Sequence, residues 1–287
     1  MARVVAVHGI NNTYASRPQM AERWIPALRG GLDNAARDGL VATVELAERD
    51  VACAFYGDVF RPPGRFLSGQ TPPLTVDDVD DGPELDLLLA WWEAAARADS
   101  GVVAPDARTL GVGASARAAM LALAGSRFLA RVSERMLVWW LKQVTAYFTD
   151  EAVRSAAQER FAAAVEADTR VVVAHSLGSV VAYEALCAHP DWPITDLVTL
   201  GSPIAVPHIV LHRLVPPVGA WPNVTRWVNI TDSGDFVALQ PVLREVYGDQ
   251  VRDIEISNGM GAHEVERYLS AAATGAAVAT GVLAGQA

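Results

Sequence analysis

The order of apolar and polar positions along the chain predicts strands that alternate with helices. Two valine-rich runs, residues 3–7 and 170–174, have almost no polar alternation, which is typical of strands buried on both faces of a parallel sheet. Shorter apolar runs predict four more strands, at 51–56, 196–200, 226–230 and 251–257. Apolar residues at helical spacing predict helices at 20–38, 151–167 and 179–188. The expected fold is therefore α/β, a mostly parallel sheet flanked by helices.

The middle of the chain has a different pattern. Residues 61–83 contain five prolines, three glycines and an acidic cluster at 77–81, which predicts a solvated linker loop. Residues 84–150 are rich in Ala, Leu, Arg and Trp and predict two or three helices, interrupted at 101–105 and 111–113. These patterns divide the chain into a core of residues 1–60 and 151–287, a linker of 61–83 and a helical cap of 84–150.

Within the expected cap, residues 136–141 are apolar on all sides of a helix, and such a run is buried, docked or in contact with an apolar ligand. Trp139 and Trp140 lie in this run. They are candidates either to line a substrate site or to dock the cap onto the core. We favour docking, because adjacent helical residues point about 100° apart and cannot both face one pocket.

Composition narrows the possible partners and the compartment. The 287 residues carry 23 basic and 33 acidic side chains, a net charge of −10, so nucleic acid is not an expected partner. Cys53 and Cys187 lie far apart and suggest neither a disulfide framework nor a zinc site. The apolar run after Arg3 is too short for a signal-peptide core, so we expect a cytoplasmic protein.

The C-terminal segment 269–287 has no charged residue, and Gly281 and Gly285 form a G-x-x-x-G pair that permits close helix contact. Its strongly apolar residues are few, so membrane insertion would be weakly driven. We expect a helix packed on the core, or a frayed tail, rather than a membrane span.

The strongest chemical signal is the sequence VVVAHSLG at residues 171–178, a buried strand that runs into a small-x-Ser-x-Gly turn and then a helix. A sharp strand-to-helix turn of this kind exposes the serine as a nucleophile, with a backbone N–H of the helix N-terminus beside it. Ser176 is the expected nucleophile and Leu177 the N–H donor. Ala174 stands where such turns usually have their first glycine.

At this motif the chain resembles the α/β-hydrolase superfamily, particularly its lipase and esterase branch. Three further segments support the resemblance, HGIN at 8–11, LVTLGSP at 197–203 and VNITDSGDFV at 228–237. Together the similar regions cover residues 3–60 and 170–270 and leave the cap unmatched. The resemblance implies that HGIN is the oxyanion loop, with Ile10 as the second N–H donor, and that the aspartate turn supplies the catalytic acid.

The expected chain order of such enzymes is nucleophile, acid, histidine, and Ser176, Asp235 and His263 satisfy it. Each follows a predicted strand, at the edge where open parallel sheets bind ligands. His263 would accept the serine proton, and the acid would orient its ring. For the acid, Asp232 is an alternative that could instead cap the turn. The resemblance favours Asp235.

Other residues near these motifs are candidates for substrate contact. They are His8 and Asn11 of the oxyanion loop, His175 beside the nucleophile, and the cap tryptophans named above. A histidine at the position of His8 more often supports the loop, and the side chain at the position of His175 is normally structural.

No metal and no cofactor is expected. His208 and His212 have the four-residue spacing of zinc ligands, but a third ligand and a catalytic glutamate are absent nearby, and residues 207–211 predict an apolar surface helix. Residues 111–116 imitate a dinucleotide-binding glycine motif without a preceding buried strand. The acidic cluster at 77–81 lacks the spaced ligand set of a calcium loop.

Two functions remain open from the sequence. The first is a serine hydrolase acting on a small-molecule or lipid-like ester with an apolar part. The second is a scaffold of the same fold, with weak or no hydrolysis, that binds a partner or lipid through the cap and the tail. The oligomeric state is left open.

Overall fold

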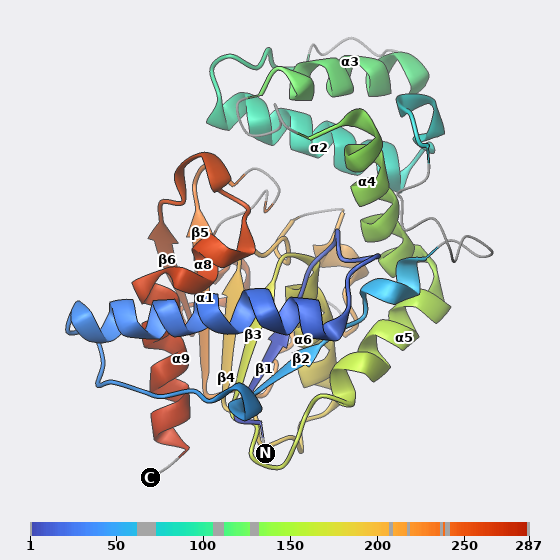
Figure 1. The fold of residues 1–287 in the computed structure, drawn as a ribbon. Helices are drawn as coiled ribbons and strands as arrows, with labels where there is room; N and C mark the ends of the chain where they lie inside the picture. The colour runs from blue at the N-terminus through green and yellow to red at the C-terminus, as the bar shows by residue number, and fades with distance from the viewer. Residues whose placement is uncertain are drawn as a thin grey trace.

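Six parallel strands form one sheet in the order β2-β1-β3-β4-β5-β6, with helices on both faces (Figure 1). This computed structural model describes residues 2–61, 73–105, 112–126, 132–206, 209–216, 219–235, 238 and 242–285. The strands are β1 (Val4–Val7), β2 (Val51–Ala54), β3 (Val171–His175), β4 (Asp196–Leu200), β5 (Arg226–Asp232) and β6 (Val251–Ile256). All six predicted strands and the parallel α/β architecture are confirmed.

The predicted burial of the valine-rich strands has a simple cause. β1 lies between β2 and β3, so that Val4 pairs with Val51 on one side and Val171 on the other. Side chains alternate across the sheet, and Val5 and Val7 enter one apolar cluster while Val4 and Ala6 enter another. Both faces therefore need apolar residues, which removes the polar alternation of a half-exposed strand.

The helices divide between the two faces. On one face pack α1 (Arg17–Arg37), α8 (Val265–Ser270) and α9 (Ala272–Ala284), and on the other α5 (Glu151–Ala162) and α6 (Leu177–Ala188). The helix predicted at 151–167 is α5, which ends at Ala162, five residues before the predicted end. A four-residue helix, α7 (Arg244–Tyr247), precedes β6. The remaining short elements are 3₁₀ turns: η1 (Glu48–Asp50), η2 (Gly57–Phe60), η3 (Val76–Asp78), η4 (Leu211–Arg213) and η5 (Gly259–Gly261).

The uncharged C-terminal segment forms a helix packed on the core, one of the two predicted alternatives. α9 crosses α1 so closely that a Cβ on Gly275 would lie 2.0 Å from the carbonyl oxygen of Gly31. A Cβ on Gly281 of the G-x-x-x-G pair would likewise lie 2.6 Å from Cγ2 of Val171 in the sheet. The small residues therefore serve helix and sheet packing within this chain. Among the helices described, none is long and apolar enough to cross a membrane.

The middle of the chain forms α2 (Pro83–Ala98), α3 (Val112–Ala124) and α4 (Glu134–Thr149), which we call the cap helices. They lie beyond the carboxyl ends of the strands (Figure 1) and enclose an apolar cluster of their own. Asp150 ends α4 and accepts hydrogen bonds from the first turn of α5, so the two helices follow each other directly. The interruption predicted at 111–113 was wrong in part, because Gly113 lies inside α3.

The described part of the linker is largely exposed, as predicted, with the side chains of Asp77 and Asp80 65% and 80% exposed. In the linker, of which residues 62–72 lie outside the described part, Asp77 pairs with Arg117 and Asp80 with Lys142 of the cap helices. The apolar surface helix expected at 207–211 was wrong. Residues 207 and 208, including His208, lie outside the described part, and Val210 is buried ahead of the single 3₁₀ turn η4.

Candidate active site

Ser176 lies between β3 and α6 with a left-handed backbone, φ +53° and ψ −130°. A non-glycine residue in this region stores roughly 1–3 kcal/mol of strain, which the surrounding structure must offset. The turn packs so tightly against the HGIN loop that neither Gly178 of the turn nor Gly9 of the loop has room for a side chain. A Cβ on Gly178 would lie 2.4 Å from the carbonyl oxygen of His8, and a Cβ on Gly9 would lie 2.6 Å from Cβ of Ser176. The predicted elbow therefore brings the HGIN loop against the serine.

The structure joins the three predicted catalytic residues by hydrogen bonds. Nε2 of His263 lies 3.1 Å from Oγ of Ser176, and Nδ1 lies 2.8 Å from Oδ2 of Asp235. The Asp235 side chain is fully buried, whereas the imidazole is 23% exposed. This arrangement allows the ring to accept the serine proton at Nε2 while Nδ1–H donates to the carboxylate.

The two candidate acids have different roles. Oδ1 of Asp232 accepts from the N–H of Gly234 at 2.7 Å, and Oδ2 accepts from the N–H of Asn258. Asp232 thus caps its own turn and ties it to the loop that carries His263. Asp235, in contrast, faces the imidazole. The geometry favours Asp235 as the residue that orients His263.

A residue that the sequence did not point to, Tyr268, also binds this carboxylate. Its hydroxyl donates to Oδ2 of Asp235 at 2.8 Å and accepts from the N–H of Asp232 at 3.1 Å. Burial and the neighbouring Asp235 charge raise the pKa of the Tyr268 hydroxyl, so it remains a donor. Tyr268 follows His263 by five residues on α8, and no motif distinguishes it from a core tyrosine.

The two predicted oxyanion donors, the backbone N–H groups of Ile10 and Leu177, belong to residues that lie close to Ser176. Leu177 is the first residue of α6, so its N–H has no acceptor within the helix. Ile10 and Leu177 line the same pocket as Ser176. The next residue, Asn11, has φ +67° and donates its N–H to Oε1 of Gln143 on α4 at 3.1 Å. The backbone of Asn11 is therefore held by a cap helix, which the sequence did not suggest.

The structure places neither His8 nor His175 in the lining of the Ser176 pocket, because both rings are buried. Nε2 of His8 accepts from the N–H of Tyr56 at 3.0 Å, and Nδ1 lies 2.6 Å from the carbonyl oxygen of Gly9. Burial lowers the pKa of His8 to about 4, so the ring is neutral. His175 packs against His263, with ring centroids 4.6 Å apart, and burial together with His263 lowers its pKa well below the ordinary value.

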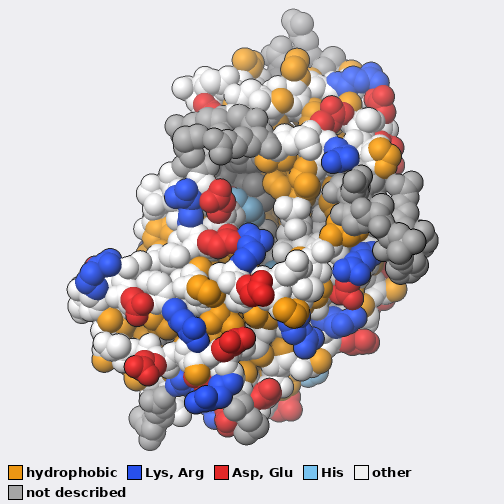
Figure 2. All heavy atoms as spheres, viewed as in Figure 1, with side chains coloured by type: hydrophobic (Ala, Val, Ile, Leu, Met, Phe, Trp, Pro, Cys, Tyr) orange, Lys and Arg blue, Asp and Glu red, His pale blue; other side chains and the backbone are white. Residues whose placement is uncertain are grey.

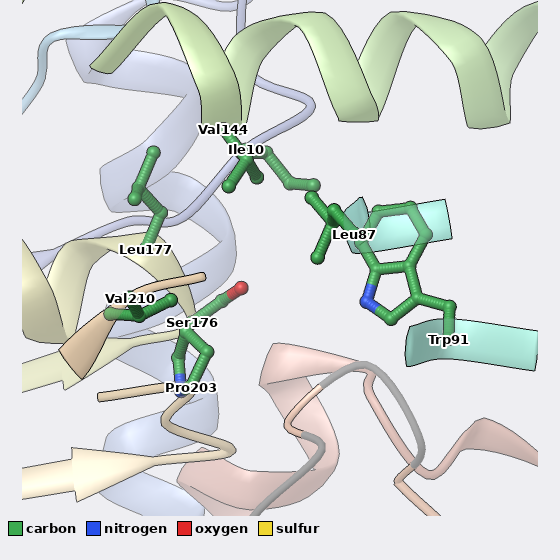
Figure 3. A pocket seen from close by; sticks show the side chains of 8 residues that line it. All are labelled: Ile10, Leu87, Trp91, Val144, Ser176, Leu177, Pro203 and Val210. Carbon is green, nitrogen blue, oxygen red and sulfur yellow. The ribbon is translucent and has the colours of Figure 1, made fainter. Parts of the chain in front are cut away.

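A narrow pocket opens at Ser176 between the core and the cap helices. Figure 2 shows a hollow in the surface there, with hydrophobic side chains on its wall and a histidine inside. The pocket contains about 370 Å³ of space between atoms, including the part open to solvent. Figure 3 shows its lining: Ile10, Leu87, Trp91, Val144, Ser176, Leu177, Pro203 and Val210.

The predicted tryptophans are not in this lining. Trp139 is buried in the core cluster beneath α4, and Trp140 packs in the cluster of the cap helices. The two side chains thus point to different clusters, as the helical geometry required. A different tryptophan, Trp91 of α2, faces the pocket instead. The cap was the right segment, but periodicity did not show which of its aromatic residues faces Ser176.

Among the described residues, no three His, Cys, Asp or Glu side chains are grouped closely enough to hold a metal ion. Comparison of the chain with protein-family models, with curated proteins and with solved structures found no match.

Proposed function

We propose that this protein is a serine hydrolase of carboxylic esters with an apolar part, built on the α/β-hydrolase fold. The observation that carries the proposal is the hydrogen-bonded series Asp235, His263 and Ser176 at the mouth of an apolar pocket. The all-parallel sheet, the strained serine turn and the chain order of the three residues support the same conclusion.

The reaction follows from the geometry. His263 accepts the Ser176 proton at Nε2 as Oγ attacks the ester carbonyl, and the resulting oxyanion accepts from the N–H groups of Leu177 and Ile10. Asp235 stabilises the imidazolium. His263 then donates the proton to the alcohol oxygen as the ester C–O bond breaks. The alcohol departs, and the acyl group remains on Ser176. A water molecule, deprotonated by His263, attacks this acyl-enzyme and releases the acid.

The pocket lining supports an apolar substrate part. None of the side chains that line it carries a charge, and two of them, Leu87 and Trp91, come from α2. Burying an apolar acyl or alcohol group against such walls contributes about 25 cal/mol per Å². The narrowness of the space favours a linear chain over a branched or cyclic one.

A fluorophosphonate probe tests the proposal directly, because it forms a covalent bond only with an activated serine. We expect mass spectrometry to locate one adduct on Ser176, and p-nitrophenyl esters of short linear acids to be turned over. Ser176→Ala should lose both, with kcat at least a thousandfold lower. Ser155→Ala, the same change on the exposed surface of α5, should retain both. A folded protein without adduct and without turnover would contradict the proposal.

The scaffold alternative has less support. The C-terminal helix, through which it would bind a partner or lipid, buries Val278, Ala279 and Val282 against the core. This helix therefore offers no extended apolar face, and the cap remains as the only segment on which a binding function would rest.

A further inference from the structure

The indole of Trp91 has an unusual environment among the tryptophans of this protein. The residue is 1% exposed, and its Nε1–H is buried without a hydrogen-bond acceptor among the described residues. Two other indoles form hydrogen bonds: that of Trp92 donates to the carbonyl of Val103 at 2.7 Å, and that of Trp227 donates to Thr199 at 3.1 Å. Leaving a buried donor unpaired costs roughly 1–3 kcal/mol, so the Trp91 N–H calls for an explanation.

Its position supplies one. Trp91 lines the Ser176 pocket, and Figure 3 shows the edge of the indole that carries the nitrogen turned toward the Ser176 hydroxyl. The indole of Trp140 also lacks an acceptor, but that residue does not line the pocket. Among the described lining residues, Trp91 and Ser176 alone have side chains that can donate a hydrogen bond.

We propose that the Nε1–H of Trp91 donates a hydrogen bond to a neutral oxygen on the substrate chain, so that the preferred substrates are esters bearing a keto or ether oxygen in the acyl chain. An indole N–H is a donor only, so its partner must be an acceptor. The acceptor is neutral because the described lining contains no cation to compensate a carboxylate or phosphate. This inference rests on the proposed ester hydrolysis and names its substrate class.

Two pairs of p-nitrophenyl esters of matched shape test this preference. In the first pair, levulinate has a ketone oxygen where isocaproate has a branching methyl group. In the second, methoxyacetate has an ether oxygen where butanoate has a methylene. Trp91→Phe keeps an aromatic ring but removes the N–H. For at least one pair, we expect the variant to lose about tenfold in kcat/KM on the oxygen-bearing ester, the value of one net hydrogen bond, and less than twofold on its partner. Comparing each ester between the two proteins cancels its intrinsic reactivity.

Trp140→Phe is the matched control, the same chemical change at an unpaired indole outside the pocket, and should leave all four rates unchanged. Equal losses by Trp91→Phe on both members of each pair would overturn the proposal. Should Trp91→Phe not fold, the indole proton resonance of Trp91 in Ser176→Ala protein gives a second measure. It should move downfield on addition of ethyl levulinate and not on addition of ethyl isocaproate, and no difference between the two would overturn the proposal.

Binding to Ser176→Ala protein, which cannot turn the ligands over, separates this inference from the proposed hydrolysis. By calorimetry, ethyl levulinate should bind this variant about tenfold more tightly than it binds Ser176→Ala/Trp91→Phe, while ethyl isocaproate binds both equally. That result without turnover by the unmodified protein would reject the hydrolysis and retain the Trp91 site. Turnover without the preference would reject the Trp91 site and retain the hydrolysis.

Discussion

Oε1 of Gln143, on cap helix α4, accepts a hydrogen bond from the backbone N–H of Asn11 at 3.1 Å. The same oxygen also accepts from Oγ1 of Thr13, and Nε2 donates to the carbonyl of Trp139 within α4. Both polar atoms of the side chain thus form hydrogen bonds, and Gln143 is only 1% exposed. It ties the loop of the proposed oxyanion hole to the cap, because Asn11 directly follows Ile10.

Gln143→Ala should therefore impair catalysis beyond its effect on stability. Without its acceptor, the strained turn at Asn11 is free to relax, and Ile10 moves from the oxyanion position. We expect kcat to fall by about tenfold to a hundredfold on short esters. The control is Thr145→Val on the same helix. It removes a buried hydroxyl that donates to the carbonyl of Leu141. It should lower the unfolding free energy comparably and leave kcat within twofold. Equal kcat values for the two variants would contradict this role.

Substitution of Asp235 and of Asp232 should have different effects on kcat and on stability. Asp235→Asn removes the carboxylate that accepts from Nδ1 of His263, and we expect kcat to fall by about 10³ to 10⁴. Asp232→Asn places an amide N–H against the N–H of Asn258, so it should lower the melting temperature with a smaller effect on kcat. Steady-state kinetics and thermal unfolding of both variants measure this. The reverse ranking of kcat would transfer the acid role to Asp232.

Gly9→Ala should inactivate the protein. The added methyl group would lie 2.6 Å from Cβ of Ser176 and 3.0 Å from the carbonyl oxygen of His175, so the loop must move away from the serine. Fluorophosphonate labelling should slow by about a hundredfold or more, the value of a lost oxyanion donor. Gly113→Ala in α3 meets no atom within 4 Å and should label normally, with stability raised by about 0.5–1 kcal/mol. Normal labelling of Gly9→Ala would show that the loop tolerates a side chain.

His8 should make folding stability depend on pH. Its folded pKa is about 4 against an ordinary 6.5, because burial favours the neutral ring. The unfolded chain therefore binds this proton first as the pH falls. The free energy of unfolding is therefore unaffected by His8 protonation above pH 6.5. It falls by about 3 kcal/mol as the pH is lowered toward 4.

Urea unfolding of the unmodified protein and of His8→Asn across this range isolates the effect. The stability difference between the two proteins should be largest above pH 6.5 and shrink by that amount near pH 4. A difference that does not change with pH would refute this role of burial.

Trp139→Ala should act on stability and not on substrate choice. Its side chain packs in the core cluster beneath α4, away from the lining of the pocket. We expect a loss of about 3–5 kcal/mol in unfolding free energy and an unchanged dependence of kcat/KM on acyl length. Leu87→Ala, which enlarges the pocket wall, should shift that dependence toward longer chains. A shifted profile for Trp139→Ala would return it to the substrate site.

The strands, their parallel arrangement and the order of Ser176, Asp235 and His263 could be read from the sequence, because these features leave local signals. A strand buried on both faces needs a continuous apolar run, and a serine turn between strand and helix needs small residues at fixed positions. His263 was predicted from its place after the last strand, and the parallel topology carries it to the same sheet edge as Ser176.

The tertiary structure alone decided which side chains surround that edge. His8 and His175 have the residue type of catalytic groups, but both rings are buried, His8 in hydrogen bonds with the backbone of Gly9 and Tyr56 and His175 against the ring of His263. The tryptophans of the cap are alike in sequence, and the way α2 and α4 pack directs Trp91 to the pocket and Trp139 to the core. The direction of each side chain depends on contacts between residues far apart in the chain. The local pattern of apolar and polar positions holds no information about these contacts.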